Sequence, residues 1–114
     1  MNILTLIITQ ANFDKIISGE KKIETREVRP TTEKKYVVIN KEGAIVDVLV
    51  YDAIRFYVGY NKDRDSALVK VEGEQLIEIV DEKDQPIYYT HKNEKHQMID
   101  IEYSLSDIIE KDIK

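Results

Sequence analysis

The chain has 114 residues and a net charge of −5 at pH 7, with 42% hydrophobic and 34% charged residues. This composition is typical of a globular protein and differs from that of a disordered or membrane protein. The chain contains no cysteine, which excludes disulfides, thiolate metal ligands and a cysteine nucleophile. A chain of this length predicts one domain, spanning residues 1–114.

The N-terminal apolar run, Ile3 to Ile8, is too short to span a bilayer, and no basic residue precedes it as in a signal peptide. We therefore expect a cytoplasmic protein without a membrane partner. Charge is unevenly distributed: residues 1–64 carry eleven Lys/Arg and nine Asp/Glu, whereas residues 65–114 carry six and thirteen. Because non-specific nucleic-acid binding needs a basic surface, a polyanion would have to bind a local site formed mainly by the first half.

The first predicted elements are a strand over residues 2–9 and a short helix over residues 10–18. The strand alternates apolar and other residues, and the helix has apolar residues at i, i+3 and i+4. Gly19 follows the helix and permits the positive φ with which helices often end. The inward residues are Leu4, Leu6 and Ile8 of the strand and Phe13, Ile16 and Ile17 of the helix.

Alternating apolar residues predict further strands along most of the remaining chain. They lie over residues 36–40, 44–51, 54–58, 67–80, 86–91 and 97–103, with turns at 41–43, 81–85 and 92–95. From Ser104 the spacing of Leu105, Ile108 and Ile109 predicts a closing helix. The fold class is mainly β (α+β): a small barrel of about six or seven strands with two or three short helices would hide the strand edges.

The stretch Ser18 to Pro30 carries the densest set of charges and predicts a strand between Gly19 and Pro30. Alternation puts Lys22, Glu24 and Arg26 on one face and Ile23 and Thr25 on the other. Two interpretations are open. Either the charged face is solvated and Ile23 and Thr25 point inward, or the charged groups converge on a ligand.

The loop over residues 59–66 combines an aromatic ring, an amide and two cations. Tyr60, Lys62 and Arg64 are candidate ligand-binding residues, because a ring and cations together can stack on a base and hold a phosphate. The alternative is a solvated hairpin loop, since Asn, Asp and Gly are common turn residues.

Other chemistry has little support in the sequence. His91 and His96 flank Glu94, but no further ligand completes a metal site, so we predict no metal. The chain has no glycine-rich phosphate loop, nucleophile elbow or metalloprotease helix, and we predict no cofactor.

The predicted helix is followed by the motif G-x-K-x-x-E-x-R, whose fixed residues are Gly19, Lys21, Glu24 and Arg26, and then by a strand. This order resembles the signature of the ASCH family, relatives of the PUA RNA-binding domain. The later segments FYVGYNKDR, ALVKV and SLSDIIE are also similar to such domains, so the resemblance covers most of the chain.

The resemblance implies a PUA-like barrel with a cleft at the motif, and binding of RNA or a small nucleotide. In that cleft Arg26 would contact a phosphate or carbonyl in a forked geometry, Glu24 would orient Arg26 or accept hydrogen bonds from a base edge, and Lys21 would add a mobile donor. We therefore take RNA or nucleotide binding as the leading hypothesis.

Two alternatives belong to other classes of function. One branch of ASCH-like proteins hydrolyses the amide of N4-acetylcytidine with a lysine, a threonine and a distant glutamate. Lys21 matches the lysine, but Glu24 occupies the threonine's position and Thr25 points to the opposite face. An amidohydrolase would then use Lys21 and Glu24 as its acid/base pair. The other alternative is a protein-interaction domain that uses an exposed strand edge.

Overall fold

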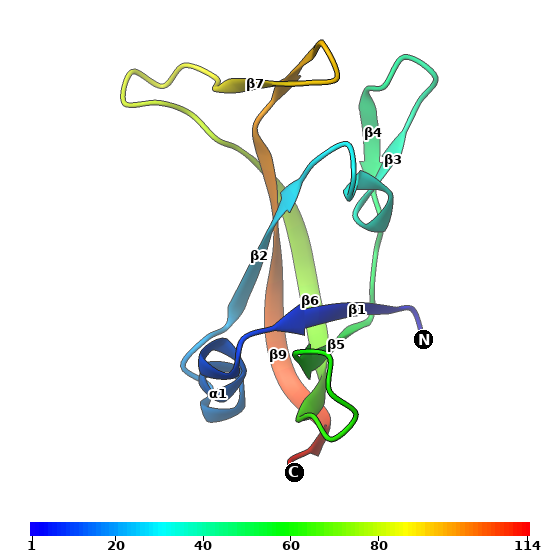
Figure 1. Ribbon diagram of the computed structural model, residues 1–114, viewed down its shortest axis with the longest axis vertical. Helices are drawn as coiled ribbons and strands as arrows, with labels where there is room; N and C mark the ends of the chain where they lie inside the picture. Colours follow the sequence, from blue (N-terminus) through cyan, green and yellow to red (C-terminus); the bar gives the residue numbers. More distant parts are fainter. The chain divides into compact units, whose positions relative to one another are not determined.

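The computed structural model describes residues 1–114 and contains nine β-strands, one α-helix and one 3₁₀ helix (Figure 1). The mainly β class predicted from the sequence is confirmed. The elements are β1 (Ile3–Ile8), α1 (Gln10–Ser18), β2 (Ile23–Val28), η1 (Glu33–Lys35), β3 (Val37–Ile39), β4 (Ile45–Val48), β5 (Ala53–Val58), β6 (Ser66–Glu78), β7 (Tyr88–His91), β8 (Glu94–Gln97) and β9 (Ile99–Asp112).

Five strands form one sheet in the order β1-β5-β6-β9-β2. The other four form two-stranded sheets, β3-β4 and β7-β8. The large sheet is open, with β1 and β2 at its edges, so the predicted barrel is not confirmed.

The chain divides into two compact units, each assembled from separate stretches of sequence. The first unit contains residues 1–24, 50–73 and 103–114, and the second contains residues 25–49 and 74–102. Strands β2, β6 and β9 each contribute residues to both units. The single-domain organisation expected from chain length stays a prediction.

The first unit is organised around β5, which pairs with β1 in parallel and with β6 in antiparallel orientation. The predicted alternation of β1 is confirmed, because Leu4, Leu6 and Ile8 are buried. Ala53, Ile54 and Phe56 of β5 are also buried, consistent with a strand between two neighbours. Most of the buried apolar residues belong to this unit: Leu4, Leu6, Ile8, Phe13, Ile16, Ala53, Ile54, Phe56, Ala67, Leu68, Val69, Val71, Tyr103 and Leu105.

Helix α1 begins and ends where the sequence predicts. The Thr9 hydroxyl accepts a hydrogen bond from the Asn12 N–H (3.3 Å), which satisfies one of the donors left free at a helix start. Gly19 ends the helix with φ of +83° and donates its N–H to the Ile16 carbonyl (3.1 Å). With nine residues, α1 is far below the roughly 20 that a transmembrane helix needs, and no helix of this chain could span a membrane.

The second unit contains both small hairpins. The predicted turn at residues 41–43 is confirmed: the Asn40 side chain accepts hydrogen bonds from the N–H groups of Glu42 and Ala44, and Gly43 has φ of +82°. The other hairpin differs from the prediction. Strand β7 pairs with β8 across a two-residue turn at Lys92 and Asn93, both at positive φ, instead of pairing with residues 97–103.

The predicted closing helix after Ser104 is wrong, because these residues continue strand β9 to Asp112. Burial keeps the two-residue period of a strand through Ile101, Tyr103 and Leu105. The Leu105 N–H also donates to the Lys22 carbonyl (2.8 Å). Backbone pairing in the sheet therefore outweighs the helical spacing of the later isoleucines.

Truncation of Phe56 tests whether β5 is the centre of the first unit. The Phe56 side chain is fully buried, with 0% exposure, so Phe56→Ala should lower the free energy of unfolding by about 3 to 5 kcal/mol. Urea denaturation followed by circular dichroism measures this change. The control Val50→Ala removes a side chain that is 63% exposed and should change stability by less than about 0.5 kcal/mol. Equal effects of the two substitutions on the free energy of unfolding would contradict the conclusion that β5 is the centre of the first unit.

Candidate functional site

Strand β2 turns its charged face inward. Glu24 is 6% exposed and Val28 is buried, whereas Ile23 is 48% exposed and Thr25 is exposed. The interpretation in which Ile23 and Thr25 point inward is therefore wrong. A buried carboxylate needs compensating partners, so this face carries a specific polar arrangement instead of a solvated charge.

Lys21 and Glu24 are brought together in the first unit. The Lys21 Nζ lies 3.4 Å from the Glu24 Oε1, and the Lys21 side chain is about a quarter exposed. The turn after α1 positions Lys21, because its backbone N–H donates to the Lys15 carbonyl (2.9 Å). Arg26, the third motif residue, is half-buried and belongs to the second unit. The structure thus pairs the acid and the base named by the sequence.

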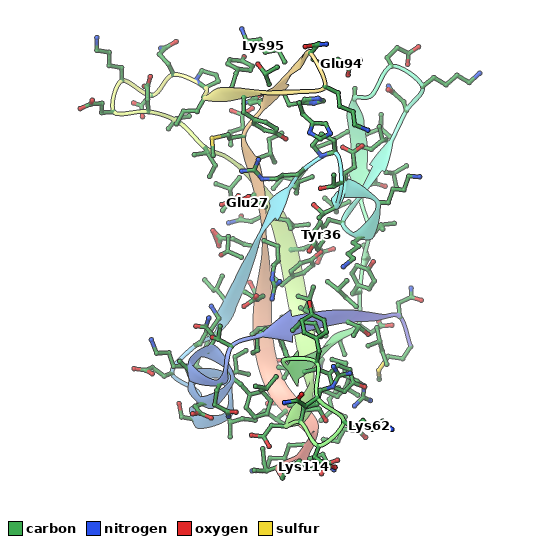
Figure 2. All side chains as sticks on the ribbon, viewed as in Figure 1. Glu27, Tyr36, Lys62, Glu94, Lys95 and Lys114 are labelled. Atoms are coloured by element: carbon green, nitrogen blue, oxygen red, sulfur yellow. The ribbon has the colours of Figure 1, made fainter.

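A groove in the first unit, here called the Tyr60 groove, contains the other three predicted site residues, Tyr60, Lys62 and Arg64. Its volume is about 500 Å³, within the range of small-molecule sites. Figure 2 shows Lys62 and Lys114 at the same end of this unit. The groove is lined by Arg55, Tyr57, Tyr60, Asn61, Lys62, Arg64, Ser66, Glu110, Asp112 and Lys114.

Two of the cations in the Tyr60 groove are neutralised by strand β9. Arg55 pairs with Glu110 (2.8 Å) and the Lys114 ammonium pairs with Asp112 (3.0 Å). Sequence reasoning missed these partners because it predicted a helix in this part of the chain.

Tyr60, Lys62 and Arg64 of the Tyr60 groove are available to a ligand. The Arg64 guanidinium lies 4.0 Å from the centre of the Tyr57 ring and donates to the Gly59 carbonyl (2.9 Å), so its position is fixed. Tyr60 is 85% exposed, and Lys62 is exposed and makes no ion pair. An exposed ring beside an unpaired ammonium and a fixed guanidinium is the combination predicted from the sequence.

Asp65 connects the loop that carries Tyr60 to the C-terminal residue Lys114. Its carboxylate accepts hydrogen bonds from the Lys114 backbone N–H (2.8 Å) and from the Gln10 side chain (3.1 Å). These bonds, the first being the larger cause, hold the pKa of Asp65 below its usual range. The loop and Lys114, which follows β9, are therefore connected by a group that stays ionised at neutral pH.

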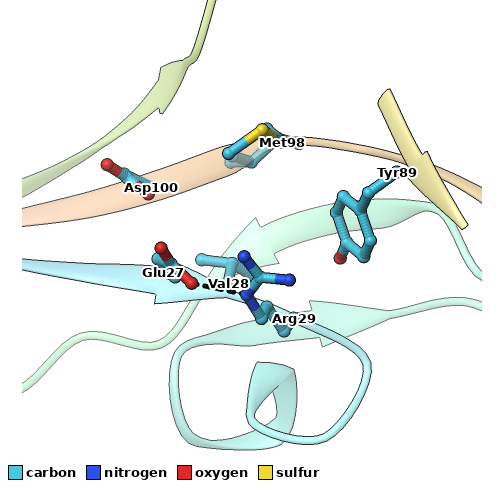
Figure 3. A pocket seen from close by; sticks show the side chains of 7 residues that line it. Glu27, Val28, Arg29, Tyr89, Met98 and Asp100 are labelled. Carbon is cyan, nitrogen blue, oxygen red and sulfur yellow. Dashed lines mark hydrogen bonds and ion pairs between the residues drawn. The ribbon is translucent and has the colours of Figure 1, made fainter. Parts of the chain in front are cut away.

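The second unit contains a cluster that the sequence did not indicate. Figure 3 shows the Arg29 guanidinium between Glu27 and Tyr89. Arg29 donates its Nε–H to Glu27 and lies 4.8 Å from the centre of the Tyr89 ring. Asp100 lines the same small cavity, whose volume of about 10 Å³ is that of one water molecule. Only the pairing of distant segments creates this cluster, so no local pattern could have revealed it.

Three groups around this small cavity have shifted pKa values. Burial raises the pKa of Asp100, and the neighbouring charge of Glu27 raises it further. The pKa of Tyr89 is raised by burial, and that of Arg29 is raised by its hydrogen bond to Glu27. Shifted titratable groups gathered at a cavity are typical of functional sites, although ion-pair networks produce them as well.

The two histidines lie on one face of the β7-β8 hairpin. The His96 ring stacks on the Tyr89 ring, with centres 5.6 Å apart. The His91 and His96 rings meet edge to face, with centres 6.2 Å apart. The Glu94 carboxylate is 3.9 Å from the His96 Nε2. The chain contains no group of three or more side chains arranged to hold a metal ion.

Comparison of the chain with models of protein families, with characterised proteins and with solved structures gave no match.

The raised pKa of Asp100 gives a test of the cluster through pH-dependent stability. A carboxyl group whose pKa is higher in the folded state stabilises the fold below its unfolded pKa of about 3.9, and this contribution is lost as pH rises through the folded pKa. Asp100→Asn should therefore raise the urea midpoint relative to wild type at pH 7, and the difference should vanish near pH 3.

The exposed residue Glu82 supplies the control, and Glu82→Gln should leave the urea midpoint close to wild type. An Asp100→Asn protein whose urea midpoint lies below wild type at pH 7 and equally far below it near pH 3 would contradict the expected sign.

Proposed function

We propose that this protein binds RNA or a nucleotide, and that the Tyr60 groove is the surface it uses. The observation that carries the proposal is the Tyr60 ring, which is 85% exposed beside the unpaired Lys62 and the positioned Arg64. An exposed aromatic ring offers a face on which a base can stack, and cations beside it can follow the phosphates.

The charge distribution supports a local site instead of a general polyanion surface. The first unit carries nine Lys/Arg and ten Asp/Glu, so its overall field does not attract RNA. Within the groove, however, two of four cations remain after Arg55 and Lys114 are paired. This favours a short single-stranded segment or a mononucleotide over a long duplex.

We also propose that the chain is an ASCH-like protein with PUA-like architecture. The order β1-α1-β2 with G-x-K-x-x-E-x-R at the helix end supports this proposal, as does the inward face of Glu24. In such a protein the Lys21–Glu24 pair would form a second recognition element, and Arg26 would be expected to contact a phosphate or a carbonyl.

Titration of a labelled single-stranded RNA, a tRNA and nucleoside triphosphates tests the proposal. Tyr60→Ala should weaken binding roughly tenfold or more, because base stacking contributes about 1 to 3 kcal/mol per base. Lys62→Ala should weaken binding and reduce the slope of log K against log salt by about 0.7, the value for one phosphate contact on a single strand. Fluorescence anisotropy at two salt concentrations measures both effects.

Lys70 provides a matched control, since it is an exposed lysine of the same unit outside the Tyr60 groove. Lys70→Ala should bind like wild type. If none of the ligands binds, or if Lys62→Ala and Lys70→Ala behave alike, the groove does not bind RNA or nucleotides.

A second candidate function rests on the Lys21–Glu24 pair. A carboxylate with little solvent exposure, 3.4 Å from an ammonium, can act as a general base while the lysine acts as a general acid. In the hydrolysis of N4-acetylcytidine, Glu24 would take a proton from a water molecule while the oxygen of that water attacks the carbonyl carbon of the acetyl group. The carbon–nitrogen bond then breaks, Lys21 protonates the leaving amine, and the products are acetate and cytidine.

Incubation with N4-acetylcytidine, followed by chromatography of the released cytidine, tests the hydrolase. Glu24→Gln and Lys21→Ala should each lower turnover by about 10²-fold or more, the range for a general acid or base. Lys22→Ala changes an exposed neighbouring lysine and should retain wild-type turnover. Wild-type turnover no faster than that of Lys21→Ala would rule out this activity.

A further inference from the structure

A buried serine lines the Tyr60 groove. Ser66, the first residue of β6, is only 8% exposed, and its side chain makes no hydrogen bond within the chain. A hydroxyl group can donate one hydrogen bond and accept two, and a side chain so little exposed normally has a partner in the protein. The Ser66 hydroxyl is therefore available to donate to a ligand in the groove.

Strand pairing places Ser66 next to the positioned guanidinium of Arg64. Ser66 lies directly opposite Tyr57 in the pairing of β5 with β6, so the two side chains share one face of the sheet, with Cβ atoms about 5 Å apart. The Arg64 guanidinium lies over the same Tyr57 ring, 4.0 Å from its centre. A hydroxyl donor and a guanidinium thus flank a single ring.

These donors match the chemistry of a phosphate group. Arg64 has five N–H groups, of which the Gly59 carbonyl takes one, and no carboxylate pairs with it. A guanidinium binds phosphate oxygens in a forked geometry, and a hydroxyl group adds a further hydrogen bond. The exposed ammonium of Lys62 lines the same groove and supplies a second uncompensated charge.

The charges of the Tyr60 groove limit how many phosphate groups it can neutralise. Four cations and two carboxylates line it and leave a net charge of +2: Arg55, Lys62, Arg64 and Lys114 against Glu110 and Asp112. A phosphate monoester carries a charge of about −2 at pH 7. One terminal phosphate group therefore balances the charge of the groove.

Strand β9 opposes a second phosphate group. Arg55 lies two residues from Tyr57 on the same face of β5, about 7 Å along the strand. Its guanidinium is already paired with Glu110 at 2.8 Å, so a phosphate group that reached Arg55 would meet a carboxylate. Like charges brought together in this way weaken binding.

We propose that the Tyr60 groove selects a nucleotide that ends in a single phosphate group, a phosphate monoester. Ser66 and Arg64 bind this phosphate, and Glu110 disfavours a ligand with further phosphate groups. The inference rests on the proposed binding of nucleotides by the Tyr60 groove and specifies the class of ligand.

Adenosine, AMP and ATP are matched probes, because they share one base and differ only in the number of phosphate groups. AMP should bind about tenfold or more tighter than adenosine, the effect of one charge-assisted hydrogen bond, and about threefold or more tighter than ATP. Titration in a magnesium-free buffer keeps the full charge of ATP. NMR chemical shifts measure the three affinities and report that the protein is folded.

Two substitutions test the roles of the named residues. Ser66→Ala removes the hydroxyl group and should weaken AMP binding about tenfold while leaving adenosine binding unchanged. Glu110→Gln releases Arg55 and should abolish the preference for AMP over ATP. Glu72 is an exposed carboxylate of β6 outside the groove, so the control Glu72→Gln should keep the wild-type preference.

An RNA pentamer with a terminal phosphate separates two sources of the same chemical group. If the pentamer binds tighter than AMP, the phosphate belongs to the end of an RNA chain. If it binds no tighter, the ligand is a free mononucleotide.

The proposal is overturned if AMP does not bind, if ATP binds as tightly as AMP, if Ser66→Ala retains AMP affinity, or if Glu110→Gln retains the preference for AMP. In each case the broader function survives as long as Tyr60→Ala weakens the binding of some nucleotide or RNA. If wild-type protein binds neither the nucleotides nor RNA, nucleotide binding by the Tyr60 groove fails as well.

Discussion

The burial of the Glu24 carboxylate fixes which side of β2 faces the interior. Because side chains alternate along a strand, one inward carboxylate also sends Val28 inward and leaves Ile23 in solvent. A one-residue shift of β2 would exchange these faces, and the turn at Gly19 together with the Lys21–Lys15 backbone bond opposes such a shift. The ion pair with Lys21 then compensates the buried charge, so local backbone geometry and electrostatics specify the same register.

The start of the fold could be predicted because its signals are local. Thr9, Phe13 and Gly19 set the beginning, the buried face and the end of α1 without help from distant residues. The end of the chain could not be predicted in this way. Ile108 and Ile109 fit a helical spacing, but β-branched residues also favour strands, and pairing with a distant strand decided the outcome.

The same distinction applies to the Tyr60 groove and to the cluster around Arg29. Tyr60, Lys62 and Arg64 lie within one loop, so their composition already indicated a binding surface. Arg29 and Tyr89 meet only because the chain returns to the same unit after the 59 residues between them. The sequence predicted a turn at residues 92–95, but without a glycine at Lys92 or Asn93 nothing indicated a two-residue turn, so the pairing that aligns Tyr89 with His96 was missed.

The parallel pairing of β1 with β5 has a consequence for biosynthesis. Strand β1 leaves the ribosome before its partner β5, which begins at Ala53 and is made about fifty residues later. At roughly 5 to 20 residues per second, the apolar face of β1 waits several seconds for that partner. During this interval Leu4, Leu6 and Ile8 lack the partner strand that buries them, and apolar surface exposed in this way makes a nascent chain prone to aggregation.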